Sequence, residues 1–126
     1  MALADTIATP EGKRRYVRRL FATIADRYDL ITVLLSCGMD RRWKKRLVAL
    51  AGPVAGARAV DLATGTGDIA FAMADAGADV VGVDVTQRMV ELAQAKPGAS
   101  SGAPRFVVGD MVALPCATAS FDVATM

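Results

Sequence analysis

Three short motifs in this sequence carry the side chains best suited to ligand chemistry. The first, residues 60–68, reads VDLATGTGD and predicts a strand that enters a glycine turn at the start of a helix. A glycine turn lets a ligand approach bare backbone, and the helix start offers N–H groups and partial positive charge. A phosphate or a carboxylate is therefore the natural ligand of Gly65, Thr66 and Gly67. A plain tight turn is the alternative for this motif taken alone.

Acidic residues follow two later apolar runs. Asp84 ends the run VVGVD (80–84), and an acid at the end of a second strand can accept hydrogen bonds from both ribose hydroxyls. Asp110 follows a third run and can accept from an adenine amino group, while Met111 packs on the ring. The alternatives are a helix-capping role for Asp84 and an ordinary strand-end acid at Asp110. Ligands of open α/β sheets bind at successive strand ends, so the three motifs together predict one nucleoside site.

The acid at position 61 narrows the choice of ligand. A run fitting G-x-G-x-x-A starts at Gly65 and allows a dinucleotide, although Asp84 would repel the 2′-phosphate of NADP. Dinucleotide folds usually keep the position of Asp61 small or apolar, because a pyrophosphate lies close by. A carboxylate there suits a cation, and S-adenosyl-L-methionine carries a positive amine and a positive sulfonium. We expect this cofactor, with a nicotinamide dinucleotide as the weaker alternative.

Strands and helices alternate after residue 52 and are expected to position these motifs. The pattern predicts four strands, at 57–63, 79–85, 105–108 and 120–126, and two helices, at 68–76 and 86–96 with Thr86 as a cap. Such alternation predicts an α/β, Rossmann-like parallel sheet with right-handed crossovers and the strand order 3-2-1-4.

The segment before this sheet is expected to be helical. Thr9 and Pro10 predict a helix start, with Thr9 as the N-cap. The apolar run 30–35 and a helix that begins at an Asp40 cap and stops at Gly52 follow. We therefore divide the chain into a helical segment, 1–52, and the N-terminal part of a cofactor-binding domain, 53–126.

The two segments differ in charge. Residues 1–51 carry 11 basic and 5 acidic side chains, giving +6, whereas residues 52–126 carry 4 basic and 8 acidic side chains, giving −4. Solvated helix faces are one interpretation of the basic segment, and attraction to an anionic membrane surface is the other. Few aromatic residues are interleaved with the basic ones, so we expect no nucleic-acid partner. The sequence predicts no oligomeric state.

The composition excludes several classes of protein. The chain has 126 residues and no histidine, and its two cysteines, Cys37 and Cys116, lie far apart. A Ser-His-Asp triad, a histidine-bound zinc, a disulfide framework and a CxxC site are therefore excluded, and no metal is expected. No apolar stretch approaches the ~20 residues that span a bilayer, and the N-terminus lacks the apolar core of a secretory signal. A cytoplasmic location is expected.

Several runs resemble those of class I S-adenosylmethionine-dependent methyltransferases. These runs are DLATGTGD (61–68), VGVD (81–84), VGDM (108–111) and SFDVAT (120–125). Two N-terminal runs, FATIADRYDL (21–30) and LSCGMDRRW (35–43), are similar to the ubiquinone/menaquinone biosynthesis C-methyltransferase family. The likeness extends from Val17 to Met126.

This resemblance implies methyl transfer from S-adenosyl-L-methionine to a ring carbon of a membrane-borne, polyprenylated quinol. It implies cofactor contacts at Thr66, Asp84 and the pair Asp110-Met111, with Asp61, Gly65 and Gly67 completing the motif. It also places the protein at the inner face of a membrane. Tyr28 and Asp29 are candidates for a general base, with helix packing and capping as the alternative, and we assign no catalytic residue.

The sequence departs from the family pattern at a few positions. Ile31 and Thr32 stand where the family usually has Met and Asn, and Asp40 stands where it usually has His. The family continues through further strands beyond Met126. We therefore expect this chain to hold about half of the sheet and to be inactive, or nearly so, by itself. A non-catalytic cofactor-binding fragment and another small-molecule methyltransferase are the alternatives.

Overall fold

The fold is built on one parallel sheet. The computed structural model describes residue 4 and residues 7–36, 39–52, 54–97 and 102–126. Four strands pair in the order β3-β2-β1-β4, all parallel, which confirms the predicted fold class and strand order. Their bounds are Arg58–Leu62 (β1), Asp79–Asp84 (β2), Arg105–Val108 (β3) and Val123–Thr125 (β4).

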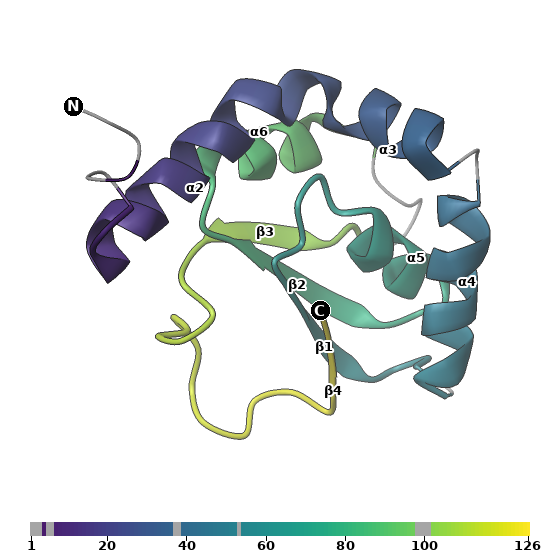
Figure 1. The fold of residues 1–126 in the computed structure, drawn as a ribbon. Coiled ribbons are helices and arrows are strands. Elements are labelled where there is room, and N and C mark those ends of the chain that lie inside the picture. Colours follow the sequence, from purple (N-terminus) through teal and green to yellow (C-terminus); the bar gives the residue numbers. More distant parts are fainter. Residues whose placement is uncertain (1–3, 5–6, 37–38, 53, 98–101) are drawn as a thin grey trace.

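The helices form two layers on one side of this sheet (Figure 1). Helices α5 (Asp68–Asp75) and α6 (Gln87–Ala95) follow β1 and β2 and pack on the sheet. An outer layer covers them and comprises α2 (Pro10–Ile24), the 3-10 turn η1 (Ala25–Arg27), α3 (Tyr28–Ser36) and α4 (Asp40–Leu50). The chain from 109 to 122 crosses the other side of the sheet as a long loop (Figure 1).

Helix starts follow the predicted signals only in part. Thr9 caps α2 as expected, because its hydroxyl accepts a hydrogen bond from the Gly12 N–H at 3.0 Å. The expected cap at Asp40 is wrong by one residue, since Met39 occupies the N-cap position of α4. Thr86 lies at the N-cap of α6, but its side chain makes no capping bond.

Helix α2 of the outer layer is attached more loosely than the inner helices. No residue of α2 is buried, although its apolar positions recur at helical spacing. The core instead lies between the sheet and the inner helices, where Met73, Val80 and Ala93 are almost completely inaccessible to water. Hydrophobic burial therefore stabilises mainly the strands with α5 and α6. None of the described helices is both long and apolar enough to cross a membrane.

The ring of Phe106 in this core explains why positions 67 and 82 are occupied by glycine. A Cβ atom at Gly82 would lie 2.6 Å from Phe106 Cδ1, and one at Gly67 would lie 2.6 Å from Phe106 Cζ. Gly67 also has a φ of 88°, which favours glycine. The ring packs on Phe71, with 5.5 Å between the ring centroids. Phe106 therefore fills the space beneath the glycine turn that a side chain at either glycine would need.

We expect Gly82→Ala to lower the free energy of unfolding by about 1–3 kcal/mol, because the added methyl group would overpack the core against Phe106. Urea denaturation measures the loss. Adding Phe106→Leu removes the ring and is expected to make the double variant less destabilised than the sum of the two single variants. Additive losses would contradict the proposed close contact.

Candidate functional site

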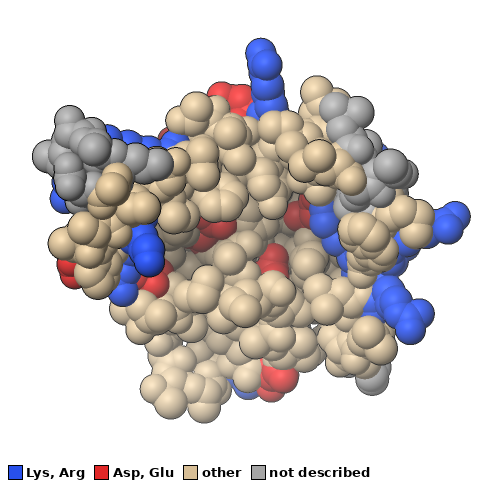
Figure 2. Space-filling view, in the orientation of Figure 1, with Lys and Arg blue, Asp and Glu red and all other residues tan. Residues whose placement is uncertain are grey.

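A cavity of about 330 Å³ lies at the carboxyl ends of β2 and β3. Figure 2 shows a hollow on this face of the molecule, with acidic side chains exposed inside it. Its sheet side is lined by Ala63, Val83, Asp84, Val85, Gly109, Asp110 and Met111, and its helix side by Lys13, Arg14, Val17 and Arg18 of α2. The cavity volume falls within the ~300–1,000 Å³ that is typical of small-molecule sites.

Asp84 links two backbone segments at the inner edge of this cavity. Its Oδ2 accepts from the Gly65 N–H at 2.9 Å, and its Oδ1 accepts from the Thr86 N–H at 2.8 Å. The carboxylate thus joins the glycine turn after β1 to the start of α6. A carboxylate has about four acceptor positions, so Asp84 retains capacity for two ligand hydroxyl groups. The expected ribose role and the alternative capping role are therefore compatible.

The glycine turn already uses part of its hydrogen-bonding capacity. The Gly65 N–H donates to Asp84, and the Gly67 N–H donates to the Thr64 carbonyl at 2.9 Å. These two N–H groups are therefore not free to bind an anion in this conformation. The Tyr28 ring approaches the same turn, since its Cε1 lies 3.9 Å from the position of a Cβ at Gly65.

Asp61 lies beneath the turn and does not line the cavity. Its side chain is buried and accepts two hydroxyl hydrogen bonds, each 2.7 Å long, from Thr64 and from Thr125 of β4. Burial raises the pKa of Asp61, and the two hydroxyl bonds oppose that rise only in part. Asp61 can therefore attract a cationic ligand through its electric field. Its hydrogen bond with Thr64 also fixes the glycine turn.

Asp110 and Met111 form the outer wall of the cavity. Asp110 Oδ1 accepts from the Val112 N–H at 3.1 Å, which tightens the loop after β3. Met111 is 43% exposed and leaves an apolar surface available for a planar ring. The structure thus brings three of the predicted residues, Asp84, Asp110 and Met111, to one cavity. It places Asp61 behind the cavity.

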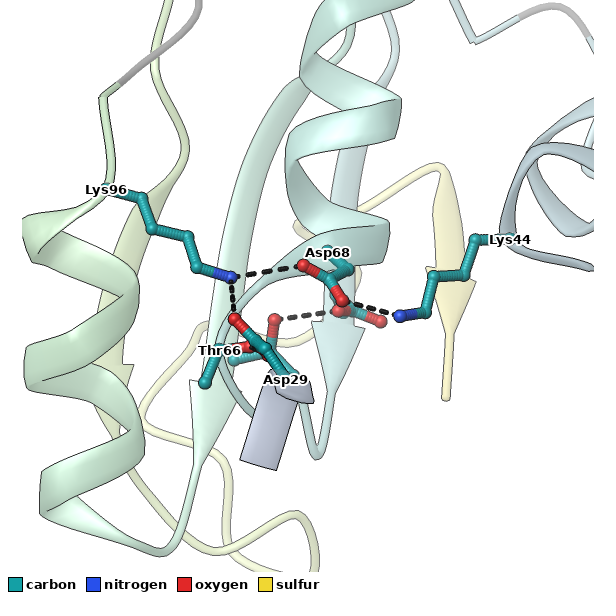
Figure 3. A network of polar contacts seen from close by, with 7 residues as sticks. Asp29, Lys44, Thr66, Asp68 and Lys96 are labelled. Atoms are coloured by element: carbon teal, nitrogen blue, oxygen red, sulfur yellow. Dashed lines mark hydrogen bonds and ion pairs between the residues drawn. The ribbon is translucent and has the colours of Figure 1, made fainter. Parts of the chain in front are cut away.

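Thr66 belongs to a second polar cluster (Figure 3), which sequence reasoning missed. Its hydroxyl donates to Asp29 Oδ1 at 2.6 Å. Lys96 Nζ lies 3.0 Å from the other oxygen of Asp29 and 3.1 Å from Asp68 Oδ1. Lys44 of α4 pairs with Asp68 Oδ2. The cluster therefore joins α3 and α4 of the outer layer to the first residues of α5.

The two lysines determine the ionisation of Asp68. Burial alone would raise the pKa of Asp68, but hydrogen bonds and positive charges from Lys44 and Lys96 outweigh it and hold that pKa below the ordinary value of 3.8. Asp29, a candidate base from the sequence, is engaged by Lys96 and Thr66 in the same cluster. Its position is that of a residue that orients the turn.

No metal site is evident in the part of the chain that the structure describes, because no three Cys, Asp or Glu side chains there gather closely enough to hold an ion. Cys116 lies outside the cavity, on the loop after β3. Cys37 lies outside the described residues.

Comparison with known proteins identifies similar sequences. The model of the ubiE/COQ5 methyltransferase family matches residues 9–126. The chain is 39% identical over 121 residues to a demethylmenaquinone methyltransferase of Deinococcus radiodurans, covering 94% of this chain and 50% of that protein. It is 42% identical over 114 residues to a ubiquinone/menaquinone biosynthesis C-methyltransferase of Rubrivivax gelatinosus, covering 90% and 44%. The chain thus spans about half the length of these curated relatives.

A solved structure supports the fold assignment. The crystal structure of magnesium protoporphyrin IX methyltransferase from Synechocystis PCC 6803 with bound SAH matches with a TM-score of 0.71 and 28% identity. The match covers 80% of this chain and 53% of the other. The parallel sheet described above is therefore that of class I methyltransferases.

We expect Asp68→Asn to lower the thermal unfolding midpoint near neutral pH and to flatten its acid dependence. The folded pKa of Asp68 lies below the unfolded value, so the ionised carboxylate stabilises the fold above pH 3.8. This contribution is lost as the pH falls through the folded pKa. The midpoints of wild type and variant should therefore converge at the acid end of a series from about pH 7 to about pH 2.

Asp75→Asn is the matched control, because Asp75 lies exposed at the end of the same helix. We expect this change to alter stability by less than about 0.5 kcal/mol at either pH. A loss from Asp68→Asn that is equally large at both ends of the series would contradict the role of its ionised form.

Proposed function

Because the chain belongs to the ubiE/COQ5 methyltransferase family, we propose that it binds S-adenosyl-L-methionine and serves methyl transfer to a ring carbon of a polyprenylated quinol in menaquinone or ubiquinone biosynthesis. One observation carries the cofactor assignment. The side chains of Asp84, Asp110 and Met111, which come from the ends of two strands, line a single cavity. Acids at the ends of successive strands are placed to hold the ribose and the adenine of one nucleoside.

The residues of the cavity fit this cofactor. Asp84 would accept hydrogen bonds from the ribose hydroxyls with the acceptor positions that Gly65 and Thr86 leave free. Met111 offers an apolar surface to the adenine ring, and Asp110 would accept from its amino group. The glycine turn would face the aminoacyl and sulfonium end, and the carboxylate of Asp61 buried behind the turn would favour positive charge there.

The chemistry that follows requires little beyond positioning. A quinol ring carbon becomes nucleophilic when a ring hydroxyl loses its proton, and bound S-adenosyl-L-methionine supplies an electrophilic methyl group. Holding two reactants in line can lower the activation barrier by up to ~7–11 kcal/mol. In this chain the contacts of Asp84 with Gly65 and of Asp29 with Thr66 would fix the turn that orients the reacting end. The catalytic base is left unassigned.

The substrate also suggests where the protein works. A quinol with a polyprenyl tail resides in a membrane, so we propose that the protein acts from the cytoplasm at the inner membrane face. The basic segment, 1–52, would lie on the substrate side of the cofactor-binding domain, 53–126. This division is supported by the outer layer that α2, α3 and α4 form over α5 and α6.

We expect the chain to bind S-adenosylhomocysteine in a calorimetric titration and Asp84→Asn to weaken that binding by at least about tenfold. A hydrogen bond to a charged group is worth about 1.5–3 kcal/mol, and this variant loses the charge. Asp79→Asn, at the opposite and exposed end of β2, is the matched control and should bind like wild type. Unchanged affinity in a folded Asp84→Asn variant, or equally tight binding of NAD, would refute the cofactor assignment.

Transfer itself is tested with methyl-labelled S-adenosyl-L-methionine and reduced demethylmenaquinone. The label should enter the extracted quinol in a carbon-linked, alkali-stable form. Because the relatives are about twice as long, a version extended to their length is the appropriate comparison, and we expect it to be much more active than the 126-residue chain. Equal turnover by the two would contradict that expectation, and an oxygen-linked methyl group would contradict the reaction.

A further inference from the structure

The outward side of α4 combines positive charge with exposed apolar surface. At 3.6 residues per turn, Arg42, Trp43, Arg46 and Leu50 fall within a sector of about 100°; we call these four residues the α4 face. Trp43 is 59% exposed and Leu50 is 73% exposed. The opposite side of the helix carries Lys44, which reaches inward to Asp68. The α4 face therefore points away from the sheet.

The neighbouring helix extends this surface. Leu30, Ile31 and Leu35 of α3 are all exposed, Leu35 to 82%. Figure 1 shows α3 and α4 following one another along one rim of the molecule, and Figure 2 shows Lys and Arg side chains projecting from that rim. Large apolar side chains exposed next to basic ones, on helices whose other sides are attached to the body, are typical of surfaces that bind a partner.

The charge distribution identifies the kind of partner. The four cations of α4 apart from Lys44 are Arg41, Arg42, Lys45 and Arg46, and the ion pairs of the described residues include none of them. The net charge is +6 over residues 1–51 and −4 over residues 52–126. An anionic surface would therefore attract the helical segment, to which α4 belongs, and repel the segment 52–126.

We propose that the α4 face, together with the exposed leucines of α3, docks on the surface of an anionic lipid bilayer. A helix that presents Arg beside Trp and Leu is suited to the headgroup region, where the aromatic ring and apolar side chains enter the acyl boundary and the cations meet lipid phosphates. A single tryptophan without further aromatic residues on this face is a poor stacking surface for RNA bases. The inference rests on the proposed function only in that a membrane-borne quinol gives the docking its purpose.

The docking surface is coupled to the candidate site through one helix. Lys44, on the inward side of α4, pairs with Asp68 at the start of α5. Asp68 is linked through Lys96 to Asp29, which accepts from Thr66 of the glycine turn. The cations that line the cavity belong to α2 and are separate from the α4 face. Docking through α4 would thus leave the cavity wall unchanged.

Trp43 provides a direct test, because it is the only tryptophan in the sequence. Its fluorescence is recorded while the chain is titrated with vesicles of equal parts phosphatidylcholine and phosphatidylglycerol, and with vesicles of phosphatidylcholine alone. The vesicles contain neither quinol nor cofactor. We expect a blue shift and quenching by brominated acyl chains with the anionic vesicles only, and loss of binding as salt is added. The absence of both changes at low salt would overturn the proposal.

Paired arginine variants distinguish binding through the α4 face from non-specific attraction by the overall positive charge. We expect Arg42→Gln with Arg46→Gln to weaken vesicle binding by about fivefold for each arginine, which corresponds to ~1 kcal/mol per basic side chain at an anionic surface. Arg58→Gln with Arg105→Gln removes the same charge from exposed positions at the start of β1 and β3 and should leave binding close to that of wild type. Equal losses from the two pairs would refute docking through α4.

Two further outcomes are decisive. Leu50→Ser is expected to reduce binding and leave the thermal midpoint unchanged, because Leu50 is exposed. Binding of polyuridylate with the Trp43 shift and without vesicle binding would replace the bilayer by RNA as the partner. Because the vesicles hold no substrate, failure of docking leaves S-adenosylhomocysteine binding intact, and failure of the proposed function leaves vesicle binding intact.

Discussion

Two buried carboxylates at the carboxyl edge of the sheet impose the constraint on which the site depends. An ionised carboxylate can be removed from water only where hydrogen-bond donors compensate it. Asp61 has the hydroxyls of Thr64 and Thr125, and Asp84 has two backbone N–H groups. These donors come from the turn, from the neighbouring strand and from the start of α6. The edge is held in one geometry because any other would leave a buried charge without a partner.

The same constraint explains why structural and ligand-binding roles coincide here. Asp84 caps backbone groups on its buried side and lines the cavity with its remaining acceptor positions. A group already fixed by two bonds loses little freedom when a ligand arrives, so preorganisation favours binding. The raised pKa of Asp61 reflects the desolvation that this arrangement requires. A bound cation nearby would relieve that cost.

Local sequence patterns predicted the strands and the glycine turn, because each rests on residues close together in the chain. The strand order followed from the general topology of open α/β sheets. They could not predict contacts between distant residues. Thr125 donates to Asp61 across 64 positions, and Lys96 reaches Asp68 across 28. Likewise, the motif VGVD identified Gly82 but not the Phe106 ring that excludes a side chain there. Nor could the helix-start signal at Thr9 and Pro10 show that α2 would be left without a buried residue.

The contrast between the two layers of helices has a consequence for function. The inner layer shares the apolar core with the sheet, and Val48 of α4 also packs against that core, whereas α2 has no buried residue. A helix without buried residues loses little hydrophobic stabilisation when it moves, so α2 can shift at a small free-energy cost while Asp84 and the turn stay fixed. A rigid cofactor edge beneath an adjustable helical cover suits a reaction between a small polar molecule and a bulky apolar one. The two reactants then meet between the cofactor edge, which stays fixed, and the helical cover, which can move.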